Sequence, residues 1–478
     1  MLRIARRVML ERGLLPAFSR SALAELATID GPARDATARD RRHLLWASID
    51  NDDSRDLDQL TVSAPGVNGN VAILVAIADV DALVKQGSAL DEHARANTTS
   101  VYTAGEIFPM LPEKLSTNLT SLGAHEERLA IVVEMQVEPS GVVASSEIYR
   151  AVVINRAKLA YNSVAAWLDG TAPAPAPVAA VSGLDEQLRV QDRVAQTMKA
   201  RRHQNGALSL ESLEPRAVFD GETLSGLRFE ARNQAKELIE DFMIAANSAT
   251  ARLLEAKQFP SLRRVLRSPD RWARIVELAA TFEVALSAEP DARGLEAFLS
   301  ARQRAEPATF PDLSLSVIKL LGRGEYVLMR PGEPAVGHFG LAVKDYTHST
   351  APNRRFPDVI TQRLLKAALA GERPPYSEAE LAELGRHCSE QEDAATHVER
   401  QVSKSAAALL LSTRLGARFS AIVTGASPKG TWVRINEPAI EGKLVRGFEG
   451  LDVGERISVQ LLQTDVERGF IDFIRMQH

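Results

Sequence analysis

The chain has 478 residues, a formal net charge of −5 and one cysteine, and 45% of its residues are hydrophobic. This length allows two to four domains with sizeable cores. The lone Cys388 excludes an internal disulfide and suits a reducing cytoplasm, where we expect the protein to act. No apolar run reaches the roughly 18 residues of a membrane-spanning helix, and Glu11 and Arg12 interrupt the N-terminal segment, so neither a transmembrane helix nor a signal peptide is expected.

Residues 1–43 are predicted to be helical, because apolar side chains recur at helical spacing at Leu2, Ala5, Val8 and Met9. A second short helix, rich in alanine and leucine, is predicted after Ser21. Together with the turn at residues 13–16, the two helices could form a helix-turn-helix-like unit. The alternative is a small appendage that only packs against the next domain.

Aspartates are concentrated between an apolar segment at residues 44–46 and another at residues 71–80. Five of them fall within nine positions, namely Asp50, Asp52, Asp53, Asp56 and Asp58. Two carboxylates about 4 Å apart repel by roughly 4 kcal/mol at an effective dielectric constant near 20, so such a cluster needs a counter-cation. Mg²⁺ suits this role, because it is usually held by one or two carboxylates and by substrate phosphates. The alternative is a solvated turn.

The rest of the chain alternates between predicted strands, linkers and helices. Residues 71–80 predict a buried strand ending in an acid, which would present the aspartates at a sheet edge. The Pro/Ala-rich segment 171–177 predicts an exposed linker, and residues 233–257 predict a long helix. Ser377 and Glu380 predict a capping box at the start of a further helix. From Phe419 onward, short strands between glycine turns predict a small β-barrel.

Three separated segments, residues 48–60, 99–122 and 338–363, resemble the RNB catalytic domain of the ribonuclease II/ribonuclease R family. The resemblance runs from about residue 44 to about residue 400. It implies a Mg²⁺-dependent 3′→5′ exoribonuclease with a curved mixed sheet surrounded by helices. Residues 415–478 resemble the S1 domain, an RNA-binding OB-fold barrel. The expected fold class is therefore α+β, with a helical unit at 1–43, the catalytic domain at 44–400 and the barrel at 415–478.

The resemblance assigns the metal ligands to the aspartate-rich loop. Asp50, Asp56 and Asp58 fall on three aspartates of the family motif, whereas the fourth position is Gln59. An amide oxygen can coordinate Mg²⁺ but carries no charge, so one metal site is expected to be weaker. Asp58 is the residue expected to be indispensable for catalysis. The alternative for Asp56 is that it holds Arg55 or the backbone of a turn.

Two tyrosines are implied to contact the end of the RNA. Tyr102 would stack on terminal bases, an interaction that tolerates any sequence. Its partner ring in some family members corresponds to Leu210, which would loosen the grip on the bases. Tyr161 would touch the last nucleotide. The alternatives are a core tyrosine at 102 and a buried, hydrogen-bonded tyrosine at 161.

Charged residues farther along the chain complete the expected site. Glu240 belongs to an acidic pair on the predicted helix 233–257 and is implied to face the active site; the alternative is an ordinary solvated helix face. Arg354 is implied to fix the terminal phosphodiester, because a guanidinium binds phosphate through two hydrogen bonds. Arg355 is expected to be a further RNA contact.

The predicted barrel supplies two aromatic candidates for base stacking, Phe419 and Trp432. The alternative for Phe419 is the barrel core. Phosphate contacts are expected from the cations nearby, at Lys429, Arg434, Lys443 and Arg446.

These features predict a monomeric, processive, Mg²⁺-dependent exoribonuclease that converts single-stranded RNA to nucleoside 5′-monophosphates. A net charge of −5 is compatible with this function if arginines line a channel inside an acidic shell. The main alternative is a catalytically weakened RNA-binding or regulatory relative, because Gln59 replaces a metal-site aspartate. A third hypothesis is endonucleolytic or DNA cleavage, since none of these candidate residues is expected to recognise a 2′-hydroxyl.

Overall fold

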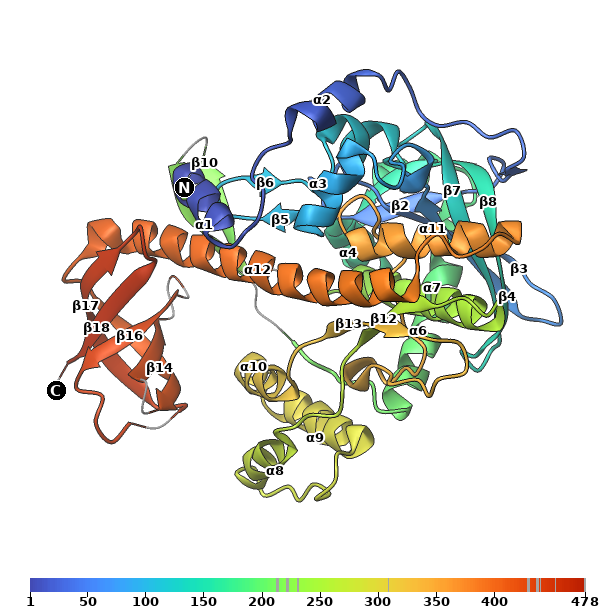
Figure 1. Ribbon diagram of the computed structural model, residues 1–478. Helices are drawn as coiled ribbons and strands as arrows, with labels where there is room; N and C mark the ends of the chain where they lie inside the picture. The colour runs from blue at the N-terminus through green and yellow to red at the C-terminus, as the bar shows by residue number, and fades with distance from the viewer. Residues whose placement is uncertain are drawn as a thin grey trace.

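The computed structural model describes residues 1–211, 215–220, 223–229, 232–307, 309–427, 430–435, 438, 440–451 and 453–476 (Figure 1). These residues form a mixed sheet with helices on both faces, a group of helices beside it and a closed barrel. This architecture confirms the α+β class. Among the described residues, no helix combines the length and the apolar character needed to span a bilayer.

The central sheet has seven strands in the order β1-β8-β7-β4-β3-β2-β9. In chain order they are β1 (Arg39–Asp40), β2 (Ala47–Asp50), β3 (Gln59–Pro65), β4 (Val71–Ala78), β7 (Glu127–Val137), β8 (Val143–Ile154) and β9 (Ala157–Ala160). Two pairs, β1 with β8 and β2 with β9, are parallel, and the others are antiparallel. Strand β4 confirms the strand predicted from residues 71–80.

Strand β4 is apolar throughout because both faces of the sheet are covered. Leu74 and Ala76 pack with α11 (Phe356–Ala370). Ile73 and Val75 pack on the other face with α4 (Tyr161–Leu168), α6 (Leu184–Gln204) and α7 (Gln234–Ala256). Helix α7 confirms the helix predicted at 233–257, and the Asn233 side chain caps it by accepting a 3.0 Å hydrogen bond from the Lys236 N–H. The linker predicted at 171–177 is interrupted by α5 (Ala176–Ala179).

The two N-terminal helices contact different parts of the molecule. Helix α1 (Leu2–Glu11) buries its apolar face against the short strands β5 (Val101–Tyr102) and β6 (Ile107–Phe108) and against α12 (Glu378–Leu411). Helix α2 (Arg20–Ala27) contacts α3 (Ala89–Asn97). This arrangement favours a packing role over a helix-turn-helix-like unit.

Helix α12 has 34 residues and starts with the predicted capping box of Ser377 and Glu380, which is confirmed. It runs from the catalytic body to the barrel (Figure 1). Beside it lies a helical group with its own apolar core, formed by α8 (Trp272–Ala280), α9 (Ala292–Ala305) and α10 (Phe310–Leu321). In the sequence, these three helices are inserted between β12 (Ser261–Val265) and β13 (Glu325–Met329), two strands that pair with each other. A separate hairpin is formed by β10 (Pro215–Asp220) and β11 (Thr223–Phe229).

The C-terminal strands close into the predicted barrel in the order β14-β15-β16-β18-β17. Their bounds are β14 (Arg418–Ser427), β15 (Gly430–Ile435), β16 (Ile440–Arg446), β17 (Arg456–Asp465) and β18 (Phe470–Arg475). Alternate residues of β15 point inward, so Val433 and Ile435 are buried whereas Trp432 and Arg434 lie on the outer face.

Candidate active site

The aspartate-rich loop connects two adjacent strands of the central sheet. Asp50 ends β2 and Gln59 begins β3, so the loop starts and finishes at the same sheet edge. Strand β9 runs parallel to β2 and pairs Ala160 with Asp50. The next residue, Tyr161, is therefore placed beside Asp50. Burial raises the pKa of the Tyr161 hydroxyl, and the nearby Asp50 charge raises it further.

Each of the three motif carboxylates is held by a different donor. Asp50 accepts hydrogen bonds from the Asn51 N–H (2.7 Å) and the Ser54 hydroxyl (2.9 Å). Asp56 accepts one from the Tyr102 hydroxyl at 3.1 Å. Asp58 accepts one from the Asn353 N–H at 2.8 Å. The alternative role for Asp56, an ion pair with Arg55, is not formed, because Arg55 lies 3.9 Å from Glu113 instead.

Asp58 is buried and only partly compensated. Its Oδ2 atom accepts no hydrogen bond from the described residues, and the Nε atom of Arg354 lies 3.4 Å away. Burial raises the pKa of Asp58 to about 7, although Arg354 opposes the shift. Burial also raises the pKa of Asp50. Both carboxylates therefore lack enough positive charge to balance them.

A short strand pairing brings Tyr102 and Arg354 to the aspartates. Thr99 forms a bridge with Arg355, and the Ser100 N–H donates to the Arg354 carbonyl at 2.9 Å. This contact joins segments separated by about 250 residues of sequence. As a result, Tyr102 reaches Asp56 from one side while Arg354 reaches Asp58 from the other.

Arg355 points away from the aspartates, unlike its neighbour. Its guanidinium donates a 2.8 Å hydrogen bond to the fully buried Asp358, whose Oδ1 also accepts the Ala351 N–H. Asp358 and the neighbouring tyrosines raise the pKa of Arg355 even though burial opposes the shift. The expected RNA contact at Arg355 is therefore replaced by an internal ion pair that fixes the loop carrying Arg354.

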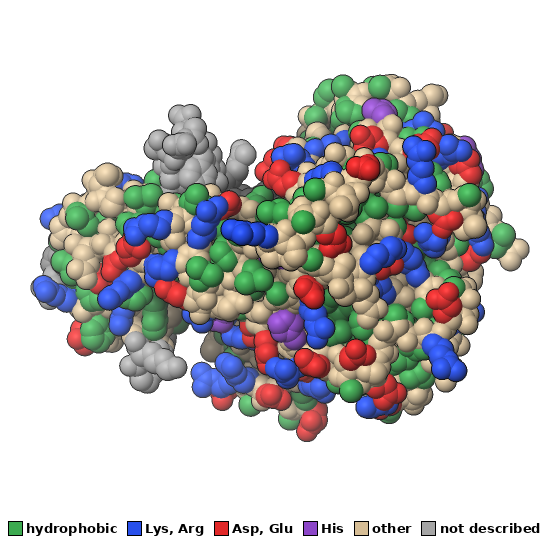
Figure 2. Space-filling view, turned by 45° about the horizontal axis from the view of Figure 1, so that its top comes forward, with side chains coloured by type: hydrophobic (Ala, Val, Ile, Leu, Met, Phe, Trp, Pro, Cys, Tyr) green, Lys and Arg blue, Asp and Glu red, His purple; other side chains and the backbone are tan. Residues whose placement is uncertain are grey.

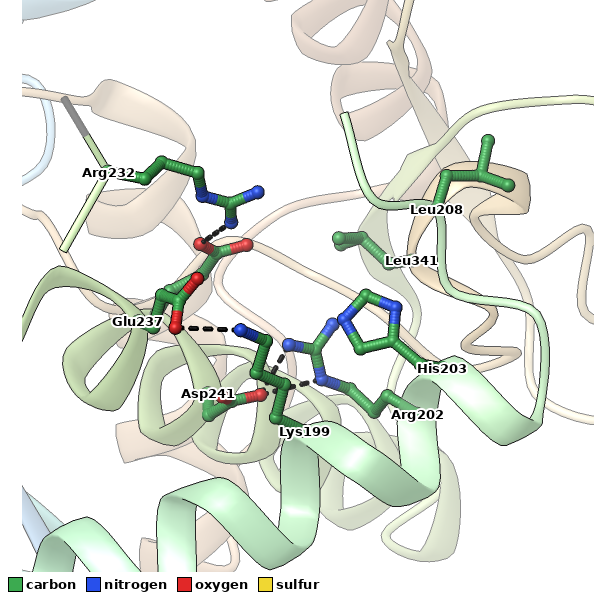
Figure 3. Close-up of a pocket in the computed structure, with 9 residues that line it drawn as sticks. Lys199, Arg202, His203, Leu208, Arg232, Glu237, Asp241 and Leu341 are labelled. Carbon is green, nitrogen blue, oxygen red and sulfur yellow. Dashed lines mark hydrogen bonds and ion pairs between the residues drawn. The ribbon is translucent and has the colours of Figure 1, made fainter. Parts of the chain in front are cut away.

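Glu240 and Leu210 share one partner, the Arg232 side chain. Arg232 donates hydrogen bonds to the Leu210 carbonyl (3.0 Å) and to Glu240 (2.6 Å). Glu240 is one of the residues that line a small pocket. Figure 3 shows this pocket between α6 and α7, with Arg232 and Glu237 labelled. The pocket's acids are paired with its bases, as between Lys199 and Glu237 at 2.7 Å. The Leu210 side chain packs against the core of the helical group formed by α8, α9 and α10.

The barrel separates its two predicted aromatic contacts. Phe419 is buried in the core, with its ring centroid 6.3 Å from that of Phe473, so the stacking role predicted for it is wrong. Trp432 lies on the outer face, where its ring could stack on a base. Arg434, on the same face, pairs with Asp312 of α10 at 2.6 Å, and the predicted contact Lys429 lies outside the described residues. On the face shown in Figure 2, basic and acidic side chains are interspersed over barrel and body alike.

The donor set fits an open magnesium site and not a closed one. Among the described residues, no three His, Cys, Asp or Glu side chains converge on one point. Mg²⁺ does not need such a cage, because it keeps water ligands and shares substrate phosphates. The buried Oδ2 atom of Asp58, which accepts no hydrogen bond from the described residues, and the raised pKa values of Asp50 and Asp58 fit a site that binds a cation. Gln59 begins β3 beside Asp58 and is half-buried.

Two supporting residues were not identifiable from sequence patterns. The Asn353 N–H is a backbone group and leaves no signal in residue identity. Glu399, on α12, accepts the Tyr102 N–H at 2.9 Å and resembles any other glutamate on a helix.

Comparison with known proteins gives a consistent result. The profile of the RNB domain matches residues 38–371, and that of the RNase II-type exonuclease C-terminal S1 domain matches residues 417–475. Ribonuclease R of Aquifex aeolicus is 30% identical over 468 residues, covering 91% of this chain and 64% of that protein. The chain spans between 50% and 64% of the length of three curated ribonucleases R that it matches.

Solved structures extend the likeness to the fold. Ribonuclease R of Mycoplasma genitalium in its apo form superposes with a TM-score of 0.87 at 21% identity, covering 99% of this chain and 78% of that chain. It has also been solved with ribose methylated single-stranded RNA and with double-stranded RNA. Yeast Ssd1, a pseudonuclease, gives a TM-score of 0.72 at 17% identity, covering 92% of this chain and 55% of that chain. At these identities the likeness shows the fold alone.

Proposed function

Because the chain belongs to the RNB-domain family, we propose that it is a processive 3′→5′ exoribonuclease that hydrolyses single-stranded RNA to nucleoside 5′-monophosphates. The observation that carries the proposal is the meeting of two distant segments at one sheet edge. The loop of Asp50, Asp56 and Asp58 faces the pairing of residues 99–102 with Arg354. Carboxylates, a guanidinium and an exposed aromatic ring together suit a phosphodiester and the base beside it.

Asp50, Asp56 and Asp58 would hold Mg²⁺, with the amide of Gln59 as a weaker candidate. When bound, the ion would activate water and neutralise charge on the phosphoryl oxygens. Because the pKa of Asp58 is about 7 without the ion, a proton competes for this carboxylate near neutral pH. Asp58 must lose that proton before it can act as a ligand.

Arg354, Tyr102 and Tyr161 would position the RNA. The Arg354 side chain is 45% exposed, so it can exchange part of its contact with Asp58 for a phosphate oxygen. The Tyr102 ring is exposed and would stack on a base near the 3′ end. Tyr161, beside Asp50, would contact the last nucleotide. Glu240 is proposed to face the same site, as the family resemblance implies, with Arg232 holding its carboxylate through a 2.6 Å hydrogen bond.

The test uses 5′-labelled single-stranded RNA with Mg²⁺ and, separately, with EDTA. We expect a stepwise ladder of shortened RNA only with Mg²⁺, and a released product with the mass of a nucleoside 5′-monophosphate. Asp58→Asn should abolish the ladder but keep RNA binding. Asp52→Asn is the matched control, because Asp52 lies in the same loop and is exposed. Internal cuts, or an unchanged ladder in EDTA, would refute the proposal. A trap of excess unlabelled RNA, added after the enzyme has bound, tests processivity.

A second candidate function is supported by Gln59. An uncharged ligand at this position leaves the site with less negative charge for Mg²⁺, and the fold also occurs in yeast Ssd1, a pseudonuclease. This alternative is a slow or inactive RNA-binding relative. The comparison of Gln59→Asp with the parent decides between the two. A rise of orders of magnitude in rate favours the weakened relative, whereas an unchanged rate counts against it.

A further inference from the structure

Tyr102 makes two contacts of different kinds through one side chain. Its ring lies at the surface, and the residue is 43% exposed. Its hydroxyl donates a 3.1 Å hydrogen bond to Oδ2 of Asp56. Within the described part of the chain, this hydroxyl is the sole hydrogen-bond donor to the Asp56 carboxylate. Asp50 and Asp58, in contrast, are held by backbone N–H groups at 2.7 and 2.8 Å.

The backbone of Tyr102 is fixed by three neighbouring elements. Its N–H donates to Glu399 of α12 at 2.9 Å. The preceding residues pair with the Arg354 loop, where the Phe356 N–H donates to the Thr98 carbonyl at 2.8 Å. Val101 is buried against the apolar face of α1. The hydroxyl is therefore presented to Asp56 from a rigid support.

Asp56 itself lacks a comparable support. It lies in the loop between β2 and β3, and the residue is half-buried. A partly exposed carboxylate can turn about its side-chain bonds unless a hydrogen bond restrains it. Partners of this kind orient metal ligands, and their loss typically lowers metal affinity or activity by roughly 10- to 100-fold.

We propose that Tyr102 is a positioning residue for the metal site, in which the hydroxyl orients Asp56 while the ring stacks on RNA. This inference rests on the proposed function, because it assumes that Asp56 is a metal ligand. The same residue would thereby bind the 3′ end of the RNA and orient a ligand of the metal site.

The two roles of Tyr102 are separable by substitution. Tyr102→Phe keeps the ring and removes the hydroxyl, whereas Tyr102→Leu removes both. Tyr149→Phe is the matched control, because the Tyr149 hydroxyl donates a 2.8 Å hydrogen bond to Glu134 on the central sheet, among residues unrelated to the proposed site. Each full-length variant is titrated with Mn²⁺, and the free ion is followed by EPR. Affinity for a fluorescein-labelled oligoadenylate is measured separately in EDTA by anisotropy.

Tyr102→Phe should weaken Mn²⁺ binding by roughly 10-fold or more and leave the RNA dissociation constant in EDTA within about twofold of the parent. Tyr102→Leu should weaken both. In an Asp56→Asn background, Tyr102→Phe should cause no further loss of Mn²⁺ affinity, because the ligand it acts through is already changed.

The positioning role is overturned if Tyr102→Phe binds Mn²⁺ as the parent does, or if it loses equal affinity in the Asp56→Asn background. That failure leaves the proposed function intact when the parent binds Mn²⁺ and degrades RNA. A parent protein that binds no Mn²⁺ overturns both.

Discussion

Asp58→Asn should leave the metal-free protein at least as stable as the parent at alkaline pH, because it removes a buried charge that lacks a full counter-charge. The pKa of Asp58 is raised by burial from 3.8 to about 7, so between these values the native protein holds a proton that the unfolded chain has lost. The free energy of unfolding therefore falls as pH rises through this window. A shift of about 3 pKa units corresponds to about 4 kcal/mol, and the part between about pH 4.5 and about pH 8 is roughly 3 kcal/mol.

The asparagine amide also affects the free energy of unfolding, because it introduces a buried hydrogen-bond donor. Its oxygen can still accept the Asn353 N–H, but its NH₂ group is a new buried donor that costs about 1–3 kcal/mol if it finds no partner. We therefore expect the variant to be less stable than the parent near pH 4.5 and equal to it or more stable near pH 8. Equilibrium urea unfolding in EDTA at the two pH values measures this difference. Asp52→Asn, at an exposed position, should match the parent at both.

Addition of Mg²⁺ provides a second comparison. A ligand that binds only the native state stabilises it in proportion to RT ln(1 + [L]/Kd), so the parent should gain stability and Asp58→Asn should gain little. If the stability difference between Asp58→Asn and the parent is the same at both pH values, Asp58 carries no buried charge penalty and the electrostatic reasoning is refuted.

Other substitutions test the barrel and the arginine loop. Trp432→Leu should weaken RNA binding by about 1–3 kcal/mol in anisotropy titrations, whereas Phe419→Leu should lower the barrel's unfolding temperature and leave RNA affinity near that of the parent; the reverse pattern would contradict the assignment of faces. Arg355→Gln should lower the free energy of unfolding by about 3–5 kcal/mol, because it leaves a buried aspartate unpaired, and equal stability in urea unfolding would argue against the internal pair. Asp312→Asn should free Arg434 and tighten RNA binding severalfold at low salt, and an unchanged affinity would count against Arg434 as a phosphate contact.

Local patterns predicted the elements that depend on nearby residues. The apolar run of β4 signals a strand covered on both faces, and the stripe of α7 and the capping box at Ser377 require neighbours only three or four positions away. The glycine-punctuated strands of the C-terminus predicted a barrel for the same reason. In each case the sequence period matches the geometry of the element itself.

Contacts between distant segments could not be predicted in this way. Nothing in the order of residues signals that Thr99 pairs with Arg355, yet this bridge brings Tyr102 to the aspartates. Arg354 and Arg355 are chemically identical, and only the packed loop directs one toward Asp58 and the other toward Asp358. Phe419 faced inward because strand alternation and pairing with Val459 decide its side of the barrel. The aspartate cluster was identifiable because five carboxylates in nine positions are unusual. The groups that hydrogen-bond to these carboxylates, such as the Tyr102 hydroxyl and the Asn353 N–H, could not be identified from the sequence.

Helix α12 takes part in three separate cores. Leu381 and Leu384 pack in the catalytic body, Val398 and Val402 pack against α1, and Leu411 packs in the barrel. At about 1.5 Å per residue its 34 residues span roughly 50 Å, and each added residue would turn everything beyond it by about 100°. The number of residues in α12 therefore sets both the distance and the relative orientation of the catalytic body and the barrel. Natural variants of this chain should tolerate substitutions on the exposed side of α12 far better than a single insertion or deletion within it.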